Sequence, residues 1–174
     1  MAPSANATDT RPELVFTFPA KMGGVSSLNY NLLNFATLLP RFRSTVVLMR
    51  EEGDTEPEFL DPFATDETVR FVYSRRENRH ELYRRLGAVL GTRPGAIVTE
   101  NLMTMAAAAY CRCPKTVFNF LHDFYYVKVN IEAGMWVDAA VSHSTFFADA
   151  AFSADPGLFS GRTFYLAYVV SQDT

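Results

Sequence analysis

Apolar residues along the chain fall into two patterns that follow each other in turn. Short runs of four to six mostly apolar residues have the length and composition of buried β-strands. Between several of these runs, large apolar residues recur every three or four positions, which is the period of an α-helix. We expect strands at 14–18, 45–49, 69–73, 96–99, 116–121, 139–142 and 163–168.

The expected helices lie in the intervals between these strands. The clearest covers 77–90, where Leu82, Leu86 and Leu90 repeat every four residues and Gly91 stands at the C-cap position. Ser144 is the expected N-cap of a helix close to the C-terminus. Further helices are expected at 25–38, 101–110, 126–136 and 144–152, and a loop is expected at 51–68.

Alternation of strands and helices predicts the fold class. Strands that follow each other through helices are joined by crossovers and form a parallel sheet. Nearly continuous apolar strands indicate a sheet that is covered on both faces. We predict an α/β, doubly wound, Rossmann-like domain at 14–174 with a mostly parallel sheet of about six or seven strands, preceded by a flexible leader at 1–13. Ligands of such sheets bind just beyond the carboxyl ends of the strands.

Composition narrows the class of protein. A length of 174 residues suits one domain, and 48% apolar residues can build a substantial core. The balance of 16 basic against 19 acidic residues disfavours nucleic-acid binding. No apolar run reaches the roughly 18 residues of a membrane-spanning helix, and the N-terminal residues lack the pattern of a signal peptide. We therefore expect a cytoplasmic protein.

Two groups of residues have competing interpretations. Cys111 and Cys113 are two positions apart, which favours two reduced thiols over a disulfide. A zinc site that adds His122 would have no recognised ligand spacing. The helix at 77–90 and the residues before it carry arginines that form either a solvated surface or a patch for anionic lipid or a phosphorylated ligand. These arginines are Arg75, Arg76, Arg79, Arg84 and Arg85.

A glycine pair follows the first strand. Gly23 and Gly24 open the helix expected at 25–38, whose free N–H groups favour an anion such as phosphate, and Ser26 or Ser27 can add a hydroxyl. A turn without a ligand would have the same sequence. The dinucleotide pattern G-x-G-x-x-G and the P-loop pattern are both absent. Their absence disfavours an NAD oxidoreductase and a P-loop NTPase.

Acidic, amide and imidazole side chains follow the fourth and fifth strands. Glu100, with Asn101 after it, can accept hydrogen bonds from substrate hydroxyls or act as a base; the alternative is a helix-capping or solvated acid. His122 can hydrogen-bond a substrate or move a proton near neutral pH, and Asp123 can orient it. The alternative is a structural histidine. No G-x-S-x-G elbow is present, which disfavours a hydrolase of that type.

Three segments in this order resemble the N-terminal half of a GT-B glycosyltransferase of the large retaining family 4. The segments are FTFPAKMGGVSSLNYNLLNF, VFNFLHDF and WVDAAVSHSTFF. They contain the Gly23–Gly24 turn, the His122–Asp123 pair and an aspartate-led strand that ends at Ser142. The resemblance covers about 14–168, which is nearly the whole chain.

This resemblance implies the acceptor-side domain of an enzyme that transfers a sugar, with retention, from a nucleotide-sugar donor to a carbohydrate or lipid-linked acceptor. It implies that Gly23, Gly24 and Val25 approach the donor phosphates. It also implies that His122, with Asp123, contacts the sugar or acceptor at the reaction centre. No cofactor and no metal are expected. The candidate substrate-binding residues are Lys21, Ser26, Glu100, Asn101 and Ser142.

The resemblance is incomplete, and it leaves alternatives open. The donor half of the family carries an E-x7-E pattern, and no two glutamates of this chain have that spacing. We therefore expect the donor-binding C-terminal domain to be absent and the chain alone to be weakly active or inactive. The main alternative is a non-catalytic Rossmann-like module for a phosphorylated ligand or another subunit; a small oxidoreductase or flavodoxin-like protein is a weaker one. A lipid-linked acceptor would add peripheral contact with the inner face of a membrane.

Overall fold

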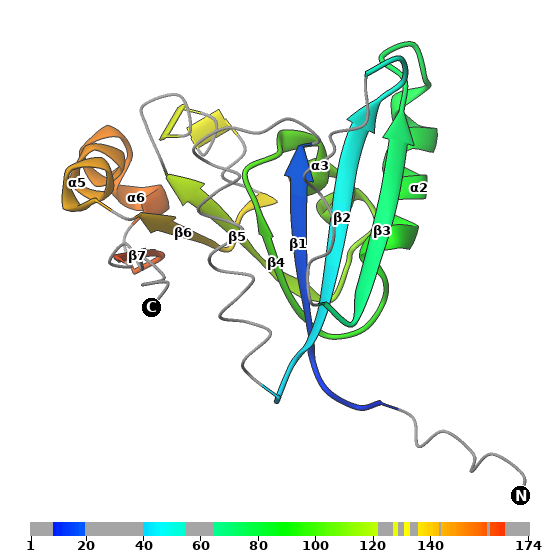
Figure 1. The fold of residues 1–174 in the computed structure, drawn as a ribbon. Helices are drawn as coiled ribbons and strands as arrows, with labels where there is room; N and C mark the ends of the chain where they lie inside the picture. Colours follow the sequence, from blue (N-terminus) through cyan, green and yellow to red (C-terminus); the bar gives the residue numbers. More distant parts are fainter. Residues whose placement is uncertain are drawn as a thin grey trace, which may run out of the picture.

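A computed structural model describes residues 9–19, 40–54, 65–121, 127–128, 131–132, 136–142, 144–159 and 161–165. Seven strands form one sheet in the order β3-β2-β1-β4-β5-β6-β7, shown in Figure 1. The strands are β1 (Glu13–Pro19), β2 (Arg43–Glu51), β3 (Glu67–Tyr73), β4 (Gly95–Thr99), β5 (Lys115–Leu121), β6 (Ala139–Ser142) and β7 (Thr163–Tyr165). The described helices are α2 (Arg79–Leu90), α3 (Leu102–Tyr110), α5 (Thr145–Ala154) and α6 (Pro156–Phe159).

All neighbouring strands run parallel, which confirms the predicted fold class. The chain passes from β1 outward to β2 and β3, and then returns to place β4 on the other side of β1. From β4 it continues outward to β7. The strand order therefore reverses between β1 and β4, and this reversal is the switch point of a doubly wound sheet. We call the edge where the strands end the carboxyl edge, and the edge where they begin the amino edge.

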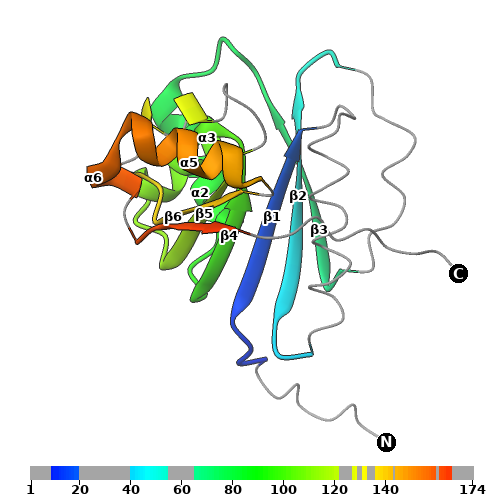
Figure 2. The same ribbon diagram turned by 90° about the vertical axis from the view of Figure 1, so that its left-hand side faces the viewer.

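Alternating side chains of the central strands build a core on both faces of the sheet. Val15 and Val47 are fully buried in a cluster with the leucines of α2 and with Met105 of α3. Phe16 and Val46, their chain neighbours, belong to a second buried cluster. Successive residues of a strand point to opposite faces, so β1 and β2 are buried on both faces. Figure 2 shows α2 and α3 on one side of β1, β2 and β3.

The helix expected at 77–90 is α2. Asn78 is its N-cap, and its side-chain oxygen accepts hydrogen bonds from the backbone N–H groups of His80 and Glu81. This cap explains why the helix begins at Arg79, two residues later than predicted. At the other end Gly91 adopts φ 72° and donates its N–H to the carbonyl of Gly87. That left-handed conformation suits glycine, as the sequence pattern indicated.

Several boundaries differ from the sequence prediction. β1 begins at Glu13, which is buried, so the leader predicted at 1–13 extends too far. β7 is described for three residues, and α6 was not expected. Ser144 is the N-cap of α5 but makes no side-chain cap bond, and its backbone N–H donates to the Ser142 hydroxyl. The helix expected at 25–38 lies outside the described residues. Of the helix expected at 126–136, residues 127–128 and 131–132 are described and α-helical, and residue 136 is described in a 3-10 turn.

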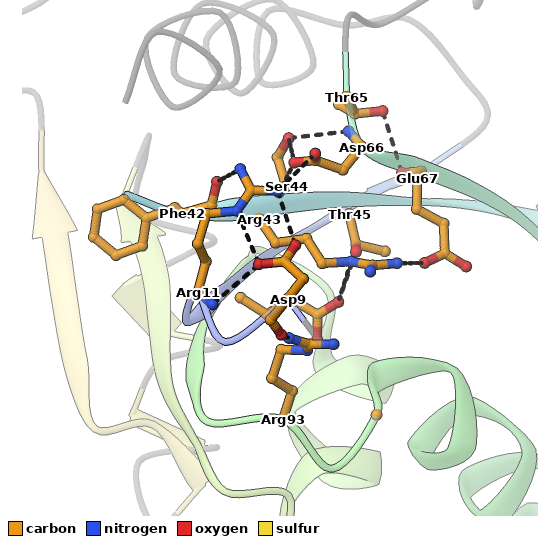
Figure 3. Close-up of polar contacts among 12 residues, drawn as sticks. Asp9, Arg11, Phe42, Arg43, Ser44, Thr45, Thr65, Asp66, Glu67 and Arg93 are labelled. Carbon is orange, nitrogen blue, oxygen red and sulfur yellow. Dashed lines mark hydrogen bonds and ion pairs between the residues drawn. The ribbon is translucent and has the colours of Figure 1, made fainter. Parts of the chain in front are cut away.

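A polar network at the amino edge ties the residues before β1 to the sheet (Figure 3). Arg11 lies 2.9 Å from a carboxylate oxygen of Asp9 and 3.0 Å from one of Asp66, and it donates to the carbonyl of Phe42. The second carboxylate oxygen of Asp66 accepts the N–H of Ser44 at 2.8 Å. One guanidinium therefore joins the approach to β1 with the start of β2 and the approach to β3.

A buried ion pair lies at the same edge. The ammonium of Lys115, whose side chain is fully buried, lies 3.1 Å from a carboxylate oxygen of Glu13. It also donates to the carbonyls of Leu90 and Gly91 at the C-terminal end of α2. The other oxygen of Glu13 accepts a hydrogen bond from the Thr45 hydroxyl. Lys115 thus neutralises a buried carboxylate and caps a helix whose C-terminal carbonyls favour a cation.

This network predicts a specific loss of stability in acid. The hydrogen bonds from Arg11 lower the pKa of Asp9 to about 2, and the Ser44 N–H lowers the pKa of Asp66. Because both folded-state values lie below those of the unfolded chain, the two carboxylates contribute stability above about pH 4. That contribution is lost as the pH falls through the folded-state pKa.

We expect the urea midpoint of the protein to fall between about pH 4 and pH 2, and the fall to be shallower in Asp66→Asn. Asp149→Asn is the matched control, because Asp149 is exposed on α5 and forms no ion pair within the described residues. Equal slopes for the two variants would show that the amino-edge network does not govern acid stability.

Candidate functional site

The candidate site lies at the carboxyl edge, around the switch point. Figure 1 shows the arrowheads of β1, β2 and β3 at the same edge of the sheet. β1 leads directly into 20–39, which contains Lys21, Gly23, Gly24, Val25 and Ser26, and β5 leads directly into His122 and Asp123. All of these residues lie outside the described part of the chain, so their assignment remains a prediction. The described candidates are Glu100, Asn101 and Ser142.

Three buried polar side chains form a row just below this edge. Thr17 of β1, Thr99 of β4 and Asn119 of β5 are all fully buried, and Thr99 is paired with Asn119 across the sheet. The hydroxyls of Thr17 and Thr99 lie 2.6 Å apart. The Thr104 hydroxyl of α3 lies 3.4 Å from that of Thr17. The three threonine hydroxyls tie the ends of β1 and β4 to α3, since buried polar groups hold fixed partners.

This row was not predicted from the sequence, although its three residues share a recognisable sequence pattern. Each member interrupts an apolar strand one to three residues before a candidate functional residue or loop: VFTFP, AIVTE and VFNFL. A polar residue at an inward position of a buried strand needs a partner. Two or three such positions in adjacent strands therefore predict a shared hydrogen-bonded row.

Glu100 and Asn101 have different roles in the connection from β4 to α3. Asn101 is the N-cap of α3, and its side-chain oxygen accepts the N–H groups of Met103 and Thr104. Its own N–H donates to the Thr99 hydroxyl at 3.0 Å. Glu100 is only 8% exposed, so it is neither a solvated acid nor the cap of the helix. Glu100 is therefore a buried carboxylate at the end of β4, beside the switch point.

Ser142 ends β6 and is fully buried. Its hydroxyl donates to the carbonyl of Ser144 at 2.7 Å and accepts the Ser144 N–H at 3.2 Å. It also lies 3.4 Å from the carbonyl of Leu121, the last residue of β5. These contacts give Ser142 a structural role in the turn that leads into α5 and connect that turn to the strand preceding His122.

A cavity of about 530 Å³ opens beside this site. It lies between the end of β3, the first turns of α2 and the first turn of α3. Leu82, Tyr83, Leu102 and Met103 form its apolar part. Its polar part is formed by the end of β3, the loop that follows and the first residue of α2: Tyr73, Ser74, Arg75, Glu77 and Arg79. Burial raises the pKa of the Tyr73 hydroxyl, which therefore stays protonated as a donor.

Three of the five arginines near α2 form ion pairs with glutamates. The pairs are Arg75–Glu51, Arg84–Glu81 and Arg85–Glu77. Arg85 also lies over the ring of Phe71, 5.1 Å from its centroid, and donates to the carbonyl of Val72. This internal pairing favours the solvated-surface interpretation over a patch for anionic lipid.

The two cysteines are free thiols at the contact between α2 and α3. Cys111 Sγ lies 3.4 Å from the carbonyl of Tyr83, and Cys113 Sγ lies 3.9 Å from that of Gly87. Burial raises the pKa of Cys113, which keeps this thiol protonated. No group of three or more His, Cys, Asp or Glu within the described ranges is placed to hold a metal ion. None of the described helices is long and apolar enough to cross a membrane.

Comparison with known proteins gives a match at the level of structure. No family model and no curated protein matches the sequence. A UDP-N-acetylglucosamine 2-epimerase superposes with a TM-score of 0.65 at 12% identity, over 89% of this chain and 48% of the epimerase. The chain has the fold of one half of a GT-B-like protein. The GT-B-like half consists of the all-parallel sheet and the helices described above.

Two further solved structures give the same result. The Anabaena protein HepE, in complex with UDP and glucose, matches with a TM-score of 0.61 at 13% identity, over 92% of this chain and 45% of HepE. The lipopolysaccharide outer core galactosyltransferase WaaB, in its apo form, matches with a TM-score of 0.65 at 11% identity, over 93% of this chain and 47% of WaaB. The GT-B-like half therefore spans about half the length of the structures it matches.

Proposed function

We propose that this GT-B-like half is the acceptor-side, N-terminal half of a retaining, family 4-like glycosyltransferase that uses a nucleotide-sugar donor in the cytoplasm. The structural match carries the proposal: about nine-tenths of the chain superposes on half of HepE and of WaaB. HepE was solved with UDP and glucose, and WaaB is named a galactosyltransferase. A nucleotide-diphosphate sugar is therefore the donor class to test first.

The arrangement of the strands supports a site at the switch point. β1, β4 and β5 are adjacent, so the segments that follow them start from the same part of the carboxyl edge. After β1 come Gly23 and Gly24, after β4 comes Glu100, and after β5 come His122 and Asp123. Helix N-termini and glycine turns suit phosphate. Carboxylate and imidazole groups suit the hydroxyls of sugars and acceptors.

In this proposal each group has a separate task. The Gly23–Gly24 turn, with Val25, approaches the donor diphosphate, which develops negative charge as the glycosidic bond breaks. Glu100 accepts hydrogen bonds from acceptor hydroxyls, and Lys21 and Ser26 add contacts from the loop after β1. Asp123 orients His122 beside the sugar.

A turnover assay tests the class of activity. The native protein is incubated with UDP- and GDP-linked sugars, with and without carbohydrate and lipid-linked acceptors, and the products are separated. Release of nucleoside diphosphate only when an acceptor is present supports the proposal. Conversion of UDP-N-acetylglucosamine without acceptor would replace the proposal with an epimerase, and binding without any turnover would favour the non-catalytic module. Tight binding of a nucleotide sugar to residues 1–174 alone would contradict the half-site.

We expect His122→Ala in the native enzyme to lower kcat/KM by about 10²-fold, because a positioned histidine typically contributes at least that factor. Its thermal unfolding midpoint should not change. His80→Ala is the control, since His80 is exposed on α2 and contacts Tyr110 at a ring distance of 5.6 Å. An unchanged rate in His122→Ala would remove His122 from the site.

A further inference from the structure

We propose that the cavity between β3, α2 and α3 binds the acceptor through a sugar ring that carries a negatively charged group, a carboxylate or a phosphate. This inference rests on the proposed function, since it assigns the acceptor class of the same half-domain. Three properties of the cavity support it: its position beside the switch point, its apolar wall, and an arginine in its lining that forms no ion pair with a described residue.

The position of the cavity connects it to the candidate site. Leu102 and Met103, which line it, directly follow Glu100 and Asn101 in the chain. The cavity therefore borders the first turn of α3, directly after the end of β4. The volume of about 530 Å³ lies within the range of small-molecule sites. It is large enough for a sugar ring with a charged substituent.

The apolar wall offers a surface for the C–H face of a sugar. Tyr83 is partly buried, and its ring lies 6.0 Å from that of Tyr110 at an angle of 56°, which restrains its orientation. Leu102 is 42% exposed although it lines a concave surface. An exposed leucine beside a restrained aromatic ring in a cavity is typical of a binding site. A sugar ring would cover both side chains.

The polar wall carries one positive charge that no residue in the described part of the chain neutralises. The guanidinium of Arg75 lies 2.8 Å from the carboxylate of Glu51, and Glu77 is paired with Arg85. Arg79 also lines the cavity but forms no ion pair with any residue that the structure describes. A planar guanidinium binds carboxylate and phosphate groups with two parallel hydrogen bonds. Tyr73 also lines the cavity, and its hydroxyl is a further donor for such a group.

These features favour a small anionic ligand over a charged surface. A membrane would be recognised by several outward-facing cations acting together. Here three of the five arginines are already paired, and Arg79, which forms no ion pair with a described residue, lies at a concave site that Tyr73 and Tyr83 also line. The single positive charge of Arg79 beside an apolar wall therefore suits a sugar ring with one negatively charged substituent.

Binding of three probes that differ in charge tests the inference. Glucose, glucuronate and glucose 6-phosphate are titrated into the native protein by isothermal calorimetry at fixed ionic strength. We expect glucuronate or glucose 6-phosphate to bind at least 10-fold more tightly than glucose, because hydrogen bonds to charged groups are the stronger ones. The tighter of the two anionic probes identifies the charged group as carboxylate or phosphate.

Matched arginine variants show whether the preference comes from the cavity. Arg79→Gln should reduce the affinity for the anionic probes to that for glucose, and Arg79→Lys should retain part of the preference. Arg76→Gln should change nothing, because Arg76 is exposed three residues away and does not line the cavity. Tyr83→Phe should keep the affinity, because the ring is retained. Circular dichroism confirms that each variant is folded.

Equal affinity for glucose and the anionic probes, equal effects of Arg79→Gln and Arg76→Gln, or no binding of any probe would overturn the inference. The proposed function is tested separately by turnover. If nucleoside diphosphate is released only with neutral acceptors, the proposed glycosyltransferase activity is supported and the proposal of an anionic acceptor is contradicted. If anionic probes bind through Arg79 but no nucleotide sugar is turned over, the anion-binding cavity is supported and the glycosyltransferase proposal is contradicted.

Discussion

Lys115→Met is expected to lower the free energy of unfolding by about 3–5 kcal/mol, the range typical of breaking one side of a buried ion pair. The substitution leaves the carboxylate of Glu13 without its closest cation, in a site where that side chain is 11% exposed. It also removes the donor that satisfies the carbonyls of Leu90 and Gly91 at the end of α2. Urea unfolding at neutral pH measures the loss.

Two companion variants separate charge from volume. Glu13→Gln combined with Lys115→Met should recover part of the loss, because no uncompensated charge then remains at the amino edge. Arg84→Ala should change stability by no more than about 0.5 kcal/mol, since the Arg84–Glu81 pair is exposed on α2. A loss below about 1 kcal/mol in Lys115→Met would show that the remaining partners of Glu13 suffice to hold its charge.

The elements of this fold that sequence predicts well are those specified by local spacing. Leu82, Leu86 and Leu90 repeat on one side of a helix, and all three are buried against the sheet. The start of α2 lies two residues after the predicted one, because it depends on capping by the Asn78 side chain, which a hydrophobic pattern does not include. The parallel sheet followed in the same way from the alternation of apolar runs with helices.

The polar contacts of the amino edge could not be predicted, since they join residues far apart in the chain. Glu13 and Lys115 are both charged and stand at the first position of a strand, where charge is usually exposed. Their burial follows from the strand order. Because only β4 separates β1 from β5, the Lys115 side chain can reach both Glu13 and the end of α2. A one-dimensional pattern contains no information on that order.

The candidate site was predictable in location and only partly in detail. The rule that ligands bind beyond the carboxyl ends of parallel strands directed attention to Glu100, Asn101 and Ser142. The structure shows that Asn101 caps α3 and that Ser142 stabilises a turn, and it shows that Glu100 is buried. The cavity beside Arg79 was not predictable, because it depends on how α2 and α3 pack.

Gly95→Ala is expected to destabilise the protein by about 3 kcal/mol or more, the upper end of the cost of inserting one methyl group into a close-packed site. Gly95 begins β4 and is paired with Glu13 across the switch point. A Cβ at Gly95 would lie 1.9 Å from the carbonyl oxygen of Glu13 and 2.7 Å from its carbonyl carbon. These are backbone atoms, so no side-chain rotation relieves the clash, and β1 and β4 must separate where they begin.

Gly53→Ala provides the control for Gly95→Ala. Gly53 has φ 91°, but a Cβ there would have no atom within 4 Å, so its cost is the left-handed conformation alone, about 1–2 kcal/mol. Because Gly95 and Lys115 both act on Glu13, their combined variant should depart from additivity by more than about 0.5 kcal/mol. Additive losses, or equal losses for the two glycine variants, would show that contact between β1 and β4 at Gly95 does not limit stability. The expected result would show that the close contact between β1 and β4 at the amino edge holds the two halves of the sheet together. This contact lies at the edge opposite the candidate site.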